Sequence, residues 1–337
     1  MSNHHYTTKE KRIKKLRYAA IVLAVLLFAS SALLFIGLWE RHNNRYSSEQ
    51  PSKAESVVEY NGQKYKLRKN IETVLILGLD KYESGSDTEE SYNNDKQSDF
   101  MMLLVIDHEA EKCSALHINR DTVAEMNILG VAGDKVGTVS KQIALAHTYG
   151  NGKEVSCRNS ADAVSALLNN IQIDRYISVT MDAVPTLVDY VGGVEVDVLD
   201  DFTGIDDTLV MGEKVNLTGE QALTYVRTRY GLEDSSNSRR MERQRQFIEA
   251  LYAKALAKSK ENSNFAVNAG AKLSEFIVSD YSGNALQKFA EKIMDYQFND
   301  ILALEGKYVE GEKHMEFYPD KASVDATVIS LFYEQKG

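Results

Sequence analysis

Ile71–Leu79 has the sequence IETVLILGL, and this stretch decides how the rest of the chain can fold. The run is almost entirely apolar and has the length of a strand. Successive side chains of a strand point to opposite faces of its sheet, so a strand that is apolar at consecutive positions must be covered on both faces. The sequence therefore predicts a central, doubly covered strand that ends at Asp80.

Further strands and helices alternate along the chain on either side of the arginine-rich stretch described below. The predicted strands are Phe100–Ile106, Cys113–Ile118, Tyr176–Thr180, Val194–Val198 and His314–Tyr318, preceded by a hairpin that turns at Asn61-Gly62. The predicted helices are Lys135–Tyr149, Ser160–Asn170, Ala183–Tyr190, Phe265–Val278, Ala285–Tyr296 and Ser323–Tyr333. Such alternation indicates an α/β fold in which a sheet lies between layers of helices.

The composition favours one globular domain behind a membrane anchor. The chain has 337 residues, 43% of them hydrophobic, with only three prolines and no flexible tract inside the body. Tyr18–Trp39 carries no charge and is longer than the roughly 20 residues that span a bilayer core. A cleaved signal peptide is the alternative, but its apolar region is typically about 7–15 residues long. The sequence predicts an uncleaved transmembrane helix over residues 18–39.

Charges on the two sides of this helix predict its orientation. Residues 1–17 carry six basic side chains and one acidic side chain, whereas the following flank mixes both signs. The positive-inside rule places the tail in the cytoplasm, so the protein is expected in the cell membrane with its body outside. Residues 40–70 are predicted to form a stalk and residues 71–337 the extracytoplasmic domain.

The charge balance argues against nucleic acid as a partner. The tail has a net charge of +5 and the whole chain −10, which leaves −15 for the remainder. Cys113 and Cys157 lie in that exported part, where a disulfide is permitted. Two buried free thiols are equally compatible with the sequence.

Arginines concentrate in Tyr225–Phe247, YVRTRYGLEDSSNSRRMERQRQF. If Tyr225–Arg229 is extended, Arg227 and Arg229 point to the same side. A helix that starts with Asn237 or Ser238 as its cap places Arg240, Arg243 and Gln244 on one face. Guanidinium groups match phosphate bidentately, so the stretch predicts a pyrophosphate site; the alternative is a solvated basic helix face.

Carboxylates at strand ends form a second candidate cluster. Asp80 closes one predicted strand and Asp99 opens the next, so antiparallel pairing would bring them together. Mg²⁺ binds one or two carboxylates together with phosphate oxygens, which makes both residues candidate metal ligands; a turn or cap role is the alternative. Arg120 follows a third predicted strand. Zinc spacing, a phosphate-binding glycine loop with lysine and a nucleophile elbow do not occur in the sequence.

Eight short segments occur in an order that resembles the LytR-CpsA-Psr family, over roughly Thr73–Lys254. They are Asp80, Ser98-Asp99, Ile118–Thr122 (INRDT), Ala146–Gly150 (AHTYG), Asp189–Val196 (DYVGGVEV), Leu217–Leu223 (LTGEQAL), Tyr225–Arg229 (YVRTR) and Arg240–Gln244 (RMERQ). The resemblance implies a short cytoplasmic tail, one membrane helix and an extracytoplasmic three-layer α/β/α domain with a mixed central sheet. It also implies a magnesium-dependent phosphotransferase that moves a glycopolymer, such as teichoic acid or capsule, from a polyprenyl-pyrophosphate carrier to peptidoglycan.

Carried over position by position, the resemblance makes Asp80 and Asp99 the magnesium-associated acids. It makes the pyrophosphate ligands Arg120, Arg227, Arg229, Arg240 and Gln244, with Arg243 on the same helix face. Three positions depart from the family pattern, where Gln97 replaces an arginine, Asn119 a proline and Asn237 an aspartate. Either Asp234 supplies that acid from the longer loop, or the carboxylate is missing.

Two other functional classes remain open at the level of sequence. A non-catalytic protein that binds lipid pyrophosphate or wall polymer would tolerate the missing carboxylate. A membrane-bound transcriptional regulator would need a DNA-binding fold, for which residues 1–17 are too short. A lipid carrier also requires an apolar groove; Val164, Leu167 and Leu168 could line it, with core packing as the alternative.

Overall fold

The computed structural model describes residues 54–80, 96–262, 265–282, 285, 289, 296–312 and 314–336. The predicted tail and membrane helix lie outside these residues, as do residues 40–53 of the predicted stalk and most of the helix at 285–296. Among the described helices, none combines the length and apolar composition needed to cross a bilayer.

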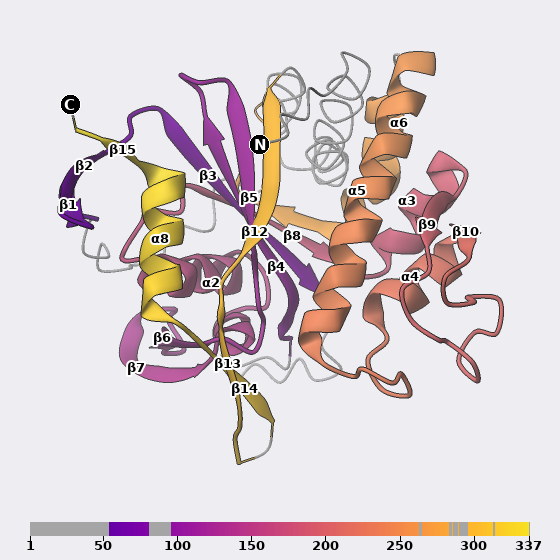
Figure 1. The fold of residues 1–337 in the computed structure, drawn as a ribbon, viewed down its shortest axis with the longest axis horizontal. Coiled ribbons are helices and arrows are strands. Elements are labelled where there is room, and N and C mark those ends of the chain that lie inside the picture. The colour runs from indigo at the N-terminus through magenta and orange to yellow at the C-terminus, as the bar shows by residue number, and fades with distance from the viewer. Residues whose placement is uncertain are drawn as a thin grey trace, which may run out of the picture.

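A six-stranded mixed sheet forms the centre of the molecule, as predicted, in the order β11-β8-β3-β4-β5-β12 (Figure 1). β3 (Ile71–Leu79) pairs in parallel with β8 (Arg175–Thr180) and antiparallel with β4 (Ser98–Asp107). The remaining strands are β5 (Lys112–Ile118), β11 (Ile277–Ser279) and β12 (Gln297–Ala303).

Side chains of β3 alternate between two hydrophobic cores, which explains the continuous apolar run. Val74 and Ile76 belong to one core, and Leu75 and Leu77 to the other. The first core packs against helices α3 (Ala183–Val191), α4 (Gly219–Arg227), α5 (Asn237–Glu261) and α6 (Phe265–Leu273). The second packs against α2 (Glu154–Leu167), α8 (Lys321–Phe332) and the 3-10 helix η3 (Ile143–Thr148). The sheet therefore lies between two layers of helices (Figure 1).

Smaller sheets lie around the central sheet and its helices. The predicted hairpin is confirmed as β1 (Val57–Tyr60) and β2 (Gln63–Leu67), and its turn has positive φ angles of 51° at Asn61 and 74° at Gly62. β2 also pairs with the C-terminal β15 (Tyr333–Gln335), so the hairpin joins the folded domain.

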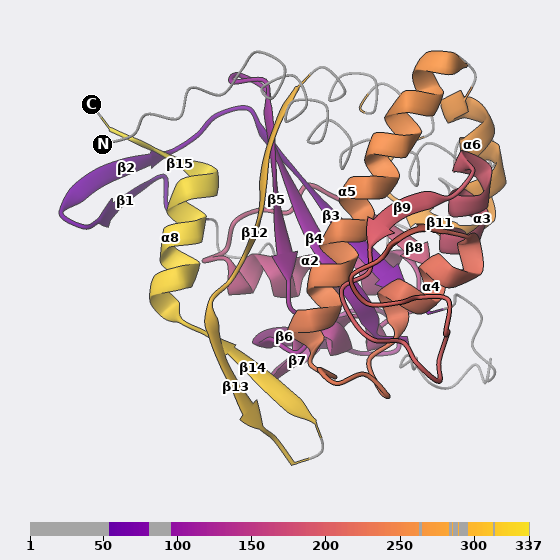
Figure 2. The same ribbon diagram turned by 45° about the vertical axis from the view of Figure 1, so that its right-hand side comes forward.

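Two further hairpins flank the end of the sheet where the predicted site residues lie. β6 (Val123–Leu129) pairs with β7 (Lys135–Gln142) in the first hairpin. β13 (Gly306–Glu310) pairs with β14 (Met315–Pro319) in the second, and this second hairpin projects from the body (Figure 2). β9 (Val194–Asp197) and β10 (Lys214–Leu217) form another two-stranded sheet.

The predicted helix over Lys135–Tyr149 is wrong. Its first half is strand β7, and only Ile143–Thr148 is helical, as η3. The sequence KVGTVSKQ contains β-branched residues and glycine, and its backbone hydrogen-bonding groups are satisfied by β6. Pairing with a strand that the sequence pattern did not reveal therefore overrides the apparent helical spacing.

The cysteines are buried free thiols. Cys113 belongs to the core on one face of the sheet and Cys157 to the core on the other. The disulfide that the sequence permitted is therefore not formed.

Candidate active site

Antiparallel pairing gathers the predicted acids at one end of the sheet. Leu79 pairs with Ser98, so Asp80, directly after β3, and Asp99, at the start of β4, lie on neighbouring strands at the same end. β5 is antiparallel to β4, and its last residue, Ile118, pairs with Met101. Arg120 therefore leaves the sheet at this end too.

The arginine-rich stretch reaches the same end from the helical layer, but not as an extended strand. α4 continues to Arg227, and its start is fixed by a capping box between Thr218 and Gln221. The N-cap of α5 is Ser236, one residue before the first predicted cap, and its hydroxyl accepts from the Arg239 amide at 3.1 Å. Arg227 and Arg229 consequently contact different acids.

Asp99 is held by two arginines. Arg120 Nη1 forms a close ion pair with Asp99 Oδ1, and Arg240 Nη1 lies 3.5 Å from the same oxygen. Arg120 Nη2 also donates to the Gln97 side-chain oxygen. Two cations therefore converge on one carboxylate oxygen.

Asp121 extends this arrangement. Its carboxylate lies 3.7 Å from Arg120 Nε and 4.0 Å from Arg229 Nη1, and it accepts from Gln142 Nε2 at 3.0 Å. Burial raises the pKa of Asp121, although Arg120 and Arg229 act in the opposite direction. We refer to Asp99, Arg120, Asp121, Arg229 and Arg240 as the arginine–aspartate cluster.

The cluster has a surplus of positive charge, since its three arginines face two aspartates in a chain with net charge −10. Arg240 is only 6% exposed, and burial, together with the charges of Arg120 and Arg229, lowers its pKa. An anion bound here would offset the mutual repulsion of the arginines. The geometry thus suits a ligand with multiple negative charges.

Arg227 lies at the exposed edge of this end of the sheet. Its Nη2 donates to Asp80 Oδ2 at 3.1 Å, and both side chains are more than half exposed. The structure therefore pairs one predicted pyrophosphate ligand with one predicted metal ligand at the surface.

Arg243 and Gln244 face the protein interior. Arg243 is fully buried, and its guanidinium donates to Asp200 and to two backbone oxygens, those of Tyr225 and Thr228. Gln244 Nε2 donates to the Val226 oxygen at 3.1 Å. These contacts tie α5 to the end of α4, which is a structural role.

Asp234 lies outside the arginine–aspartate cluster. It is exposed, and its Oδ1 accepts from the Ser236 amide at 2.8 Å just before α5. Hydrogen bonding by Ser236, first through its side chain and then through its amide, lowers the pKa of Asp234. The structure thus gives Asp234 a local role at the start of the helix, and among the described residues the Asn237 side chain bonds to Asn119 and Arg240 and to no carboxylate.

Sequence reasoning missed three residues that the structure adds to the site. Asp121 entered only as part of the segment Ile118–Thr122, Asn119 only as a departure from a family pattern, and Tyr308 not at all. Asn119 Nδ2 donates to the Tyr308 hydroxyl, which also lies 2.9 Å from Ser238 Oγ. The separation of 189 residues between Asn119 and Tyr308 explains why no local pattern indicated the contact.

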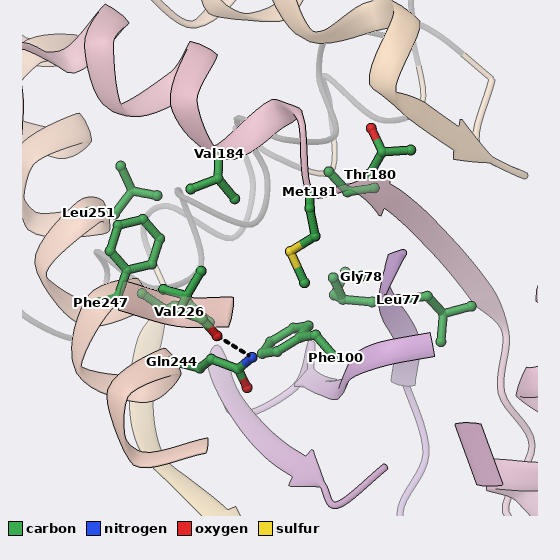
Figure 3. Close-up of a pocket in the computed structure, with 13 residues that line it drawn as sticks. Leu77, Gly78, Phe100, Thr180, Met181, Val184, Val226, Gln244, Phe247 and Leu251 are labelled. Atoms are coloured by element: carbon green, nitrogen blue, oxygen red, sulfur yellow. Dashed lines mark hydrogen bonds between the residues drawn. The ribbon is translucent and has the colours of Figure 1, made fainter. Parts of the chain in front are cut away.

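An apolar cavity opens beside the cluster, between the sheet and helices α3, α4 and α5 (Figure 3). With its open mouth it comprises about 660 Å³. Its lining residues are Ile76, Leu77, Gly78, Phe100, Val179, Thr180, Met181, Val184, Val226, Gln244, Phe247, Ile248 and Leu251.

Residues that line the cavity are adjacent in the sequence to residues of the polar site. Phe100, in the wall, follows Asp99, and Val226 precedes Arg227. Gly78 pairs with Phe100 across the two strands, and a Cβ atom at Gly78 would lie only 2.8 Å from the Phe100 Cβ. The absence of a side chain at this position allows Phe100 to sit where it lines the cavity.

The groove residues considered from the sequence lie elsewhere. Val164 and Leu168 are buried in the opposite core, and Leu167 packs against it. Their role is core packing, the alternative reading, because α2 covers the face of the sheet away from the cavity.

The donor set can be tested for its fit to Mg²⁺. Groups of three or more metal-ligating side chains are absent from the described part of the chain. Both arginine contacts of the Asp99 side chain are to Oδ1, which leaves Oδ2 for a metal. Asp80 and Asp99 at one sheet end fit an ion that takes one or two carboxylates and completes its shell with phosphate oxygens and water.

The chain is similar in sequence to several known proteins, of which three are described. An uncharacterized protein of Staphylococcus aureus is 29% identical over 72% of this chain and 57% of its own length. The teichoic acid transferases TagU of Enterococcus faecalis and TagV of Bacillus subtilis are 28% and 27% identical, over 86% and 67% of this chain. The matches span 85% of TagU but 56% of TagV.

Solved structures share the fold. Protein gbs0355 from Streptococcus agalactiae superposes with a TM-score of 0.63 at 21% identity, covering 78% of this chain and 86% of that one. TagT, solved bound to LIIa-WTA, gives a TM-score of 0.58 at 20% identity, covering 85% and 97%. The family model described as "LytR_cpsA_psr family" matches residues 38–324. With most of its length matched by that model, this chain belongs to the LytR_cpsA_psr family.

Proposed function

We propose that this protein is a membrane-anchored phosphotransferase that moves a glycopolymer from a polyprenyl-pyrophosphate carrier to a hydroxyl of peptidoglycan. The observation that carries the proposal is that a charged cluster of side chains lies next to an apolar cavity. A positively charged arginine–aspartate cluster adjoins an apolar cavity through Asp99-Phe100, and the neighbouring Arg227–Asp80 pair adjoins it through Val226. A lipid pyrophosphate combines the same two features, a charged head and an apolar tail.

The names of two relatives agree with this chemistry. TagU and TagV are named polyisoprenyl-teichoic acid–peptidoglycan teichoic acid transferases. Both proteins are less than a third identical to this chain, so the polymer that it carries is part of the proposal.

The proposed reaction forms one P–O bond and breaks another. The acceptor hydroxyl oxygen attacks the phosphorus nearest the first sugar of the polymer and loses its proton. The bond from that phosphorus to the bridging oxygen breaks, and polyprenyl phosphate leaves. Negative charge grows on the departing phosphate, and Arg120, Arg229 and Arg240 of the cluster would stabilise it.

Asp80 and Asp99 are the residues that would hold Mg²⁺. The ion, when bound, would neutralise part of the pyrophosphate charge. The side chains themselves act by positioning: Asp99 orients Arg120 and Arg240, and Asp80 orients Arg227.

The direct test is transfer by the full-length protein in detergent. A polyprenyl-pyrophosphate-linked glycopolymer is offered with peptidoglycan, and release of polyprenyl phosphate and polymer bound to peptidoglycan are both measured. Wild type should transfer polymer. In Arg120→Lys the transfer rate should fall at least about ten-fold, because lysine lacks the planar guanidinium fork that holds phosphate. Arg175→Lys, an exposed position at the far end of β8, is the control. Binding without turnover by wild type would support a non-catalytic binder instead.

The membrane anchor at residues 18–39 and the extracytoplasmic body are part of the same proposal. The basic tail and the uncharged apolar run support them. Protease added to intact protoplasts should digest the body and spare the tail. A protected body would contradict this topology.

A further inference from the structure

We infer that Tyr308, on the projecting β13–β14 hairpin, is a positioning residue that orients Arg240 through two asparagines, Asn119 and Asn237. The inference rests on the proposed function only for the choice of pyrophosphate as ligand. Its basis is an unbroken series of hydrogen bonds between elements that are far apart in the sequence.

The series begins at the guanidinium. Arg240 donates from Nε and Nη2 to Asn237 Oδ1, at 3.1 and 2.6 Å. Asn237 Nδ2 donates to Asn119 Oδ1 at 2.7 Å, and Asn119 Nδ2 donates to the Tyr308 hydroxyl. Having accepted that bond, the hydroxyl is free to donate its own proton to Ser238 Oγ, 2.9 Å away. Every donor therefore points away from the cation, an arrangement in which successive hydrogen bonds strengthen one another.

The amide orientations are determined by their neighbours. Turning the Asn237 amide over would place its NH₂ group against the Arg240 guanidinium, so that two donors would face each other. The same change at Asn119 would break the bonds that its Oδ1 accepts from Asn237 and from the Asp121 amide, the latter at 3.0 Å. Because Asn119 and Asn237 are both buried, the lost bonds could not be replaced by water.

The contacts also explain why Arg240 remains able to bind an anion. Its shortest bonds go to the neutral amide of Asn237, whereas its contacts with Asp99 are 3.4 and 3.5 Å long. Asp99 is paired more closely with Arg120. The asparagines therefore fix the position of Arg240 without neutralising it.

The hairpin is secured to the site by more than Tyr308. The Phe317 amide donates to the Asp121 oxygen at 2.8 Å, and Gln142 Nε2 donates to the Met315 oxygen at 2.8 Å. Removing a single hydroxyl from Tyr308 should therefore change the hydrogen-bond series and leave the hairpin in place.

Tyr308→Phe removes the last link, and Tyr318→Phe provides a matched control on the same hairpin, because the exposed Tyr318 hydroxyl donates to Glu316. Affinity for inorganic pyrophosphate is measured by titration calorimetry on the full-length protein. Tyr308→Phe should weaken it about three- to ten-fold, the effect of one hydrogen bond, and Tyr318→Phe should leave it unchanged.

A second readout follows Arg240 itself without a ligand. In protein labelled with ¹⁵N-arginine, the Arg240 Nε–H resonance is assigned from its loss in Arg240→Lys. Its exchange with solvent should be several-fold faster in Tyr308→Phe than in wild type or Tyr318→Phe.

Unchanged Nε–H exchange in Tyr308→Phe overturns the inference. So does unchanged affinity, if the wild type binds pyrophosphate. A wild type that binds no pyrophosphate would contradict the proposed function instead, and the exchange measurement alone would then decide the role of Tyr308.

Discussion

The Arg227 guanidinium lies 3.1 Å from the Asp80 carboxylate, and these side chains are 56% and 53% exposed. An exposed ion pair contributes only about 0–1 kcal/mol to stability. The pair is therefore poorly explained as a stabilising contact. Its location beside the arginine–aspartate cluster makes ligand binding the better explanation.

Arg227→Lys and Arg229→Lys should separate these explanations. Lysine keeps the charge but lacks the planar fork that holds phosphate bidentately, so transfer should fall by at least about ten-fold. The free energy of unfolding should change by less than about 1 kcal/mol. Turnover and urea denaturation are compared with Arg175→Lys. Near-normal turnover in both variants would refute their role in the site.

Arg243 should behave in the opposite way, because its guanidinium is fully buried and bonded to Asp200, Tyr225 and Thr228. Arg243→Met leaves part of the Asp200 charge and two backbone oxygens uncompensated, and should cost about 3–5 kcal/mol of unfolding free energy. Urea denaturation measures the loss, with the half-buried Arg245→Met on the same helix as the control. A stable Arg243→Met would return Arg243 to the list of ligand candidates.

Arg240 and Arg243 show where prediction from sequence stops. Helical spacing correctly placed both on α5, but it could not distinguish the arginine that faces the cluster from the one enclosed by α4 and Asp200. By contrast, the apolar patterns of Ile71–Leu79 and Phe100–Ile106 were sufficient to predict two strands, and their antiparallel pairing places Asp80 and Asp99 at the same end of the sheet. Local patterns determine elements; the partners of a polar side chain depend on which distant elements pack against it.

Filling the cavity should impair use of long lipid carriers selectively. Val184 points into the cavity from α3 (Figure 3), so Val184→Phe would occupy space proposed for the lipid tail. We expect the KM for a long-chain polyprenyl-pyrophosphate donor to rise several-fold, while inorganic pyrophosphate binds as in wild type. Val131→Phe, at an exposed position, is the size-matched control. Equal effects on both ligands would indicate general damage and contradict a tail-binding cavity.

Two buried histidines predict acid sensitivity. Burial lowers the pKa of His147 to about 4 and the pKa of His117 well below its usual value. Between about pH 6.5 and 4 the unfolded chain takes up a proton at His147 that the folded chain does not, so stability falls as the pH decreases. The loss from His147 alone approaches about 3 kcal/mol at pH 4.

Urea denaturation at several pH values between 7 and 4 measures this loss. His147→Gln should reduce the pH dependence, whereas His314→Gln, at an exposed position, should retain it. Identical pH profiles for wild type and His147→Gln would show that His147 does not titrate as its burial implies.

Asp99→Asn tests the metal and the carboxylate together. The substitution nearly preserves shape but removes the negative charge that Arg120 and Arg240 share, together with a proposed magnesium ligand. Transfer should fall strongly, and the remaining activity should no longer respond to added Mg²⁺, whereas wild type treated with a chelator should recover when Mg²⁺ is restored. Asp134→Asn, in the exposed turn between β6 and β7, controls for loss of charge alone. If Asp99→Asn retained the magnesium response of wild type, Asp99 would be excluded as a ligand, and its interaction with the two arginines would remain as its role.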